Sequence, residues 1–78
     1  MKVKAEDLLN IANIVLTQMG VEKFRDVKLG YVNKIDDEWR VTLSFRDEAG
    51  WFATNASFAI NGETGEIRGM WLGRQWEK

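Results

Sequence analysis

The sequence contains no cysteine, no histidine and no proline among its 78 residues. Without cysteine or histidine, the chain cannot build the common zinc sites, a thiol nucleophile or a catalytic triad with an imidazole base. We therefore predict a protein that is not an enzyme and that uses no metal or other cofactor. Because no disulfide can form, a fold of this length must be stabilised by a well-patterned apolar core.

Neither sign of charge dominates, and long apolar runs are missing. Lys and Arg total 11 and Asp and Glu total 12, a balance that argues against binding nucleic acid or membranes through bulk charge. No apolar run exceeds three residues, and Glu6 and Asp7 interrupt the region where a signal peptide needs an apolar stretch. These features predict a single domain over residues 1–78 in the cytoplasm, with no membrane association and with nucleic acid disfavoured as a partner.

Residues 5–19, AEDLLNIANIVLTQM, have the period of an amphipathic helix. At 100° per residue one broad stripe collects the apolar side chains Leu8, Leu9, Ile11, Ala12, Val15, Leu16 and Met19. Ile14 projects to the polar side, and Gly20 is suited to end the helix in a left-handed conformation. The sequence therefore predicts one helix with a single apolar face.

After Gly20 the period becomes two, which is typical of strands. The alternation predicts strands over about 26–33, 38–46, 51–61 and 66–72. In the first, Val27, Leu29 and Tyr31 are expected on one face; in the clearest, that face carries Trp39, Val41, Leu43 and Phe45. Shifting this strand by one residue would expose all four of its apolar side chains, so its register should be strongly fixed.

The last strand is predicted to place Ile67 and Trp71 inward and Arg68, Met70 and Leu72 outward, and its glycines indicate possible bulges. Two turns fit the preceding segment FAINGETGEI. Either Asn61 and Gly62 form a two-residue turn, or the loop runs from Asn61 to Thr64 and Gly65 supplies a positive φ. Both alternatives keep Ile67 on the face of Phe58.

One helix followed by strands with short connections predicts an α+β fold, in which the N-terminal helix packs across a three- to four-stranded antiparallel meander. The helix stripe can cover only one face of the sheet. The opposite face, which we call the open face, should meet water or a partner. Its basic and apolar side chains, with Trp76 near the terminus, are the candidate binding residues: Trp51, Met70, Leu72, Trp76, Arg40, Arg46 and Arg68.

The helix, the strand EWRVTLSF and the segment ASFAINGETGEI together resemble PepSY-type domains, in which a helix precedes W-x-V and Y/F-x-V/I-(D/N)-x-x-T-G-E-I strands. Trp39 to Val41 and Phe58 to Ile67 carry this resemblance. It implies a cystatin-like α-β-β-β(-β) fold and a protein-binding or peptidase-regulating role. The segments LTQMG, EWRVTL, FAINGETGEI and RGMWLGRQW also resemble, more weakly, the C-terminal region of gas vesicle protein O. That likeness implies an accessory protein of a larger assembly.

The leading hypothesis is a non-enzymatic interaction module that binds a protein or peptide through the open face or an edge strand, or that self-associates as a homodimer. An alternative is single-stranded nucleic-acid binding, in which Lys28 joins the arginines of the open face and bases stack on its aromatic rings. The same basic side chains can also be explained without any ligand, because an antiparallel sheet with one buried face carries polar residues on the face that meets water.

Overall fold

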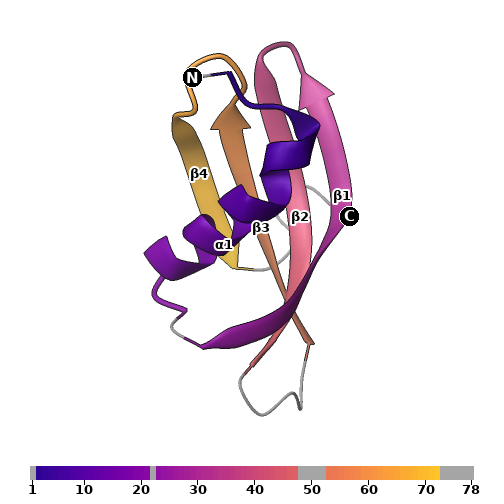
Figure 1. The fold of residues 1–78 in the computed structure, drawn as a ribbon, viewed down its shortest axis with the longest axis vertical. Coiled ribbons are helices and arrows are strands. Elements are labelled where there is room, and N and C mark those ends of the chain that lie inside the picture. The colour runs from indigo at the N-terminus through magenta and orange to yellow at the C-terminus, as the bar shows by residue number, and fades with distance from the viewer. Residues whose placement is uncertain (1, 22, 48–52, 73–78) are drawn as a thin grey trace.

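The computed structural model describes residues 2–21, 23–47 and 53–72. A short 3-10 helix, η1 (Ala5–Asp7), leads into α1 (Leu8–Gln18), and four strands follow: β1 (Phe24–Ile35), β2 (Glu38–Asp47), β3 (Ala53–Asn61) and β4 (Ile67–Leu72). The strands form one antiparallel sheet in the order β1-β2-β3-β4, and α1 crosses one face of it diagonally (Figure 1). The predicted α+β arrangement, with one helix on a four-stranded antiparallel sheet, is confirmed.

The predicted helix is present, divided into η1 and α1. Its first turn carries Asp7, whose carboxylate accepts a hydrogen bond from the backbone N–H of Lys4 at 2.9 Å. Gly20 follows the helix with a φ of 88°, the left-handed conformation expected of it. Leu9 departs from the predicted stripe, because 45% of its surface is exposed. Ile14, which was predicted to project to the polar side, is 53% exposed. Among the described residues, no helix has the length and apolar character that crossing a bilayer requires.

The core lies between α1 and the sheet face that α1 covers, which we call the inner face. Every second residue of β2 enters it, with Val41, Leu43 and Phe45 no more than 6% exposed. The buried residues of α1 complete the layer: Leu8, Ile11, Ala12, Val15 and Leu16. This arrangement follows from the sequence, because one apolar stripe and one apolar sheet face can be removed from water only against each other.

Trp39 joins three segments at one end of the sheet. Its indole N–H donates to the carbonyl of Val3 at 3.3 Å, and the Val3 N–H donates to the carbonyl of Gly62 at 2.6 Å. The ammonium of Lys34 lies 5.2 Å from the centre of the indole ring. A Cβ on Gly62 would lie 3.2 Å from the indole nitrogen and from the Asp37 carbonyl, so only glycine fits here without displacing a neighbour.

The β3–β4 loop adopts the second of the two predicted turns. Gly65 has a φ of 79° and its N–H donates to the carbonyl of Asn61 at 2.9 Å. The Asn61 side-chain oxygen accepts from the N–H groups of Glu63 and Thr64 at 2.8 and 2.9 Å. The Thr64 hydroxyl accepts from the N–H of Glu66 at 3.2 Å. These bonds account for the glycine, threonine and asparagine of this stretch as turn chemistry.

Leu43 and Leu9 offer a matched test of this core, because the same substitution removes the same atoms from a buried and an exposed site. Leu43 is 1% exposed, so Leu43→Ala should lower the free energy of unfolding by about 2–5 kcal/mol. Leu9→Ala should change it by less than about 0.5 kcal/mol, because its site is a helix surface. Urea unfolding followed by circular dichroism measures both, and equal losses would contradict the assignment of the core.

Candidate functional site

A bulge in β4 decides which face each of its side chains occupies. Ile67 lies opposite Ile60, but Gly69, two residues later, lies opposite the adjacent Ala59, so Arg68 is an extra residue. Beyond it the alternation is reversed from the prediction. Met70 lies opposite Phe58 on the inner face, and Trp71 lies opposite Ser57 on the open face.

The predicted faces of Met70, Leu72 and Trp71 were therefore wrong. Met70 and Leu72 belong to the inner face, at its edge, where they are 37% and 62% exposed. Their neighbours across the strand pair, Phe58 and Ala56, are fully buried. Exposure thus rises abruptly from β3 to β4, which leaves an apolar margin along the edge of the sheet.

β1 contains two bulges, and the one between Leu29 and Tyr31 also reverses a predicted face. Leu29 lies opposite Leu43 on the inner face, whereas Tyr31 lies opposite Thr42 on the open face, so Gly30 is the extra residue. The expectation that Tyr31 shares a face with Leu29 was therefore wrong. A glycine inside a strand is the sequence signal for such a bulge.

The bulges at Gly30 and Arg68 place Tyr31 and Trp71 in the same cross-strand row of the open face. The row runs Tyr31, Thr42, Ser57, Trp71 across β1 to β4. Thr42 and Ser57 are 4% and 0% exposed, and their hydroxyl oxygens are 3.2 Å apart, a hydrogen bond inside the row. The Trp71 ring lies over Gly69, where a Cβ would be 2.5 Å from the ring.

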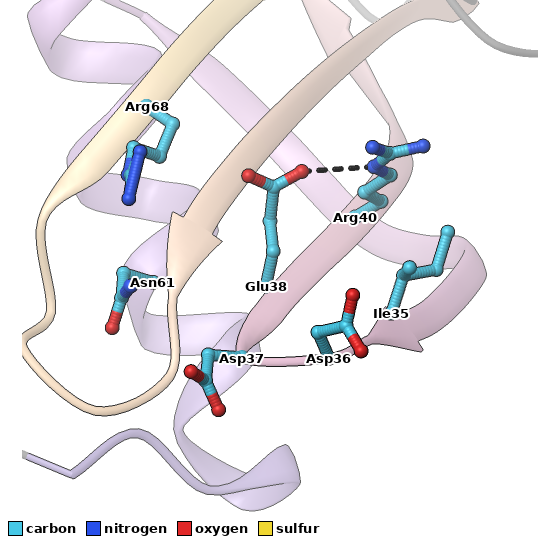
Figure 2. A pocket seen from close by; sticks show the side chains of 7 residues that line it. All are labelled: Ile35, Asp36, Asp37, Glu38, Arg40, Asn61 and Arg68. Atoms are coloured by element: carbon cyan, nitrogen blue, oxygen red, sulfur yellow. Dashed lines mark hydrogen bonds and ion pairs between the residues drawn. The ribbon is translucent and has the colours of Figure 1, made fainter.

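A polar pocket of about 270 Å³ opens at one end of this face, next to the β1–β2 turn (Figure 2). Its lining combines acidic, basic and apolar side chains: Ile35, Asp36, Asp37, Glu38, Arg40, Asn61 and Arg68. Arg40 is 2.9 Å from the Glu38 carboxylate and Arg68 is 3.3 Å from that of Glu66. Three carboxylates and two guanidinium groups line this pocket, so its charges nearly balance.

The structure brings two of the predicted binding residues together and separates the others. Arg40 and Arg68 line the same pocket, whereas Arg46 lies six residues further along β2, about 20 Å away. Trp51 and Trp76 lie outside the described residues. Tyr31 and Arg25, which the sequence reasoning did not select, also face the open side; a cross-strand register, which the sequence does not contain, is needed to find them.

Within residues 2–21, 23–47 and 53–72, no group of three side chains from His, Cys, Asp and Glu is arranged to hold a metal ion. Comparison with protein-family models, curated proteins and solved structures gave no match. The resemblances to PepSY-type domains and to gas vesicle protein O therefore stay predictions.

The contact between Trp71 and Gly69 can be tested by adding one methyl group. Gly69→Ala would place a Cβ within 2.5 Å of the ring, so the ring must leave its position and stability should fall by about 1–3 kcal/mol. The control Gly30→Ala meets only the Thr42 carbonyl at 3.5 Å and should not displace a ring. The indole N–H signal of Trp71 in an NMR spectrum should shift in the first variant and stay in place in the second.

Proposed function

We propose that this chain is a non-enzymatic interaction module in which the edge strand β4 pairs with an extended segment of a partner protein. The observation that carries the proposal is the exposed apolar margin formed by Met70 and Leu72 beside a fully buried row of β3. An edge strand also presents backbone N–H and C=O groups that its own sheet does not use. Together these features supply both parts of strand addition, backbone pairing and side-chain contact.

The two edges of the sheet are not equivalent. Natural edge strands avoid association by carrying charges, proline or bulges. β1 has two bulges and the charged residues Arg25, Lys28 and Lys34. In β4, the stretch after the bulge reads Gly-Met-Trp-Leu, with no charge and no proline. β4 is therefore the edge on which pairing is least hindered.

The geometry defines the chemistry of the partner segment. An added antiparallel or parallel strand would point every second side chain toward the inner face, beside Met70 and Leu72. The segment should therefore be extended and apolar at alternate positions. The resemblance to PepSY-type domains agrees with this role, because it implies a protein-binding module. A cytoplasmic location is part of the proposal, since a chain without cysteine needs no oxidising compartment to fold.

Binding by β4 should be lost when charges are placed on its edge. The probes are peptides selected on the wild-type protein from a display library of random 12-residue sequences. Replacing both Met70 and Leu72 by Lys should weaken binding about 100-fold, because burial of each apolar side chain contributes about 1.5–3 kcal/mol and each 1.4 kcal/mol is a factor of ten. Isothermal titration calorimetry measures the affinities.

The matched control is Leu9→Lys with Ile14→Lys, which adds the same two charges at exposed apolar positions of α1. This control should bind the selected peptides as the wild type does. N-methylation of alternate peptide nitrogens should abolish binding, because it removes the backbone donors that strand pairing requires. Peptides that bind the Met70→Lys, Leu72→Lys variant unchanged, or that perturb NMR signals of β1 alone, would refute the proposal.

A further inference from the structure

Asn61 and Gly62 form the one asparagine–glycine pair in the sequence. The other asparagines, at positions 10, 13, 33 and 55, precede isoleucine, lysine or alanine. In every such pair the backbone nitrogen of the second residue can attack the side-chain carbonyl of the asparagine, and a side chain on that second residue hinders the approach. Glycine has no side chain, so Asn61 is the asparagine of this chain that is intrinsically most reactive toward deamidation.

Deamidation of this pair proceeds in two steps. In the first, the Gly62 nitrogen forms a bond to Cγ of Asn61, the bond from Cγ to Nδ2 breaks, and ammonia leaves with the proton of the Gly62 amide. In the second, water opens the cyclic imide. Attack of water at Cγ gives aspartate in a normal main chain, whereas attack at the backbone carbonyl carbon gives iso-aspartate, whose main chain runs through the former side chain. Water is the co-reactant, and neither step oxidises or reduces the chain.

The folded turn polarises the carbon that is attacked. The side-chain oxygen of Asn61 accepts from the backbone N–H groups of Glu63 and Thr64 at 2.8 and 2.9 Å. Two backbone donors on one carbonyl oxygen are the arrangement of an oxyanion hole, and these distances lie in the range that stabilises the negative oxygen formed by attack on the carbonyl. The electrophile is therefore prepared for the reaction in the folded state.

The same turn restrains the nucleophile. Ring closure requires the peptide group that joins Asn61 to Gly62 to rotate until its nitrogen faces Cγ. Both ends of that peptide are hydrogen bonded, because the Asn61 carbonyl accepts from Gly65 at 2.9 Å and the Gly62 N–H donates to the carbonyl of Asp37. Gly62 is also buried, and the indole nitrogen of Trp39 is 3.2 Å from the position of a Cβ on it. The attack therefore cannot occur until this peptide is released.

We propose that Asn61 is a site of spontaneous deamidation, and that the Trp39 corner, the contacts of Trp39 with Val3 and Gly62, is its gate. While the corner is closed, the Val3 N–H and the indole ring hold Gly62 in place and the clamped peptide does not react. When the corner opens, the freed nitrogen meets a carbon that is already polarised. Because ammonia is lost, the reaction does not reverse when the corner closes again. The turn thus converts a transient opening of the molecule into a permanent covalent change.

The products alter both the turn and the polar pocket. Iso-aspartate adds one carbon to the main chain at position 61, so the carbonyl bonded to Gly65 and the N–H bonded to Asp37 lose their present spacing. Either product also replaces a neutral amide by a carboxylate in a pocket that already contains Asp36, Asp37 and Glu38 (Figure 2). Like charges repel, so the near balance of charge in the pocket is lost after the reaction.

Deamidation is measured by mass spectrometry of peptides from the full chain, after incubation at one pH and temperature in buffer and in guanidinium chloride. In the denaturant we expect Asn61 to be the first asparagine converted. In buffer its conversion should be at least tenfold slower, because only molecules with an open corner react. Fragmentation by electron transfer distinguishes iso-aspartate from aspartate.

The gate is tested with Trp39→Phe, which keeps an aromatic ring but removes the indole N–H that donates to Val3. In buffer this variant should convert Asn61 about fivefold faster than the wild type, the factor that corresponds to the net contribution of one hydrogen bond. The matched control, Tyr31→Phe, removes a polar group from a ring that is 47% exposed on the open face and should change the rate less than twofold. Neither variant should change the rate in guanidinium chloride.

Three results would overturn the proposal. Conversion of the wild type in buffer as fast as in denaturant would show that the folded turn does not restrain Gly62, and this comparison needs no variant. Equal rates for the wild type and a folded Trp39→Phe variant in buffer would show that the Trp39 corner is not the gate. Earlier conversion of another asparagine in denaturant would show that Asn61 is not the reactive site. Circular dichroism establishes that the variants are folded in buffer.

Discussion

The burial of one helix stripe against one face of the sheet is the contact on which every other feature of this structure depends. α1 supplies the apolar cover, and alternate residues of β2 and β3 supply the surface that it covers. Val15 and Val41, from the two layers, are both fully buried. Since the side chains of a strand alternate between two faces, this contact also determines which residues can meet water or a partner. The residues proposed to bind a partner are therefore residues that this contact leaves outside the core.

Two of the bulges in the edge strands, at Gly30 and at Arg68, change which side chains lie outside the core and leave the core itself intact. Gly30 in β1 and Arg68 in β4 each add one residue to an edge strand, while β2 and β3, at the centre, pair without interruption. After each bulge the following side chains exchange faces. Tyr31 and Trp71 thereby reach the open face, and Met70 and Leu72 reach the apolar margin of the inner face. Bulges are common at sheet edges, where they re-aim side chains in this way.

The sequence was sufficient to predict the helix, the strands and the face of the central strands. Its signal is strong wherever apolar residues repeat at an unbroken period, as in Glu38–Asp47. Of the predicted inward residues of that strand, Val41, Leu43 and Phe45 are buried and Trp39 is partly buried against the core. The signal failed where the period is interrupted. A glycine in a strand permits a bulge. Which residue becomes the extra one, however, depends on how the strand pairs with a neighbouring strand that is distant in the chain. Tyr31, Met70 and Trp71 were misplaced for that reason.

The candidate surfaces were predictable only in part. Met70 and Leu72 were expected to be exposed and are, yet on the inner face instead of the open one. Arg40 was expected on the open face and lines a pocket there, but its pairing with Glu38 could not be read from composition. Arg46 was expected on the open face and lies there, but its position directly opposite Arg25 is known only from the register of β1 with β2.

Trp39 has a consequence for how unfolding can be observed. Its single ring contacts Val3 before the helix, Lys34 in β1 and Gly62 after β3. Segments from the beginning, middle and later part of the chain therefore share one chromophore. The chain has four tryptophans, so a variant that keeps only Trp39 is needed to observe its emission alone. In that variant, the fluorescence of the indole would report whether these three distant stretches separate together or one at a time, and so whether this corner of the molecule behaves as a single cooperative unit.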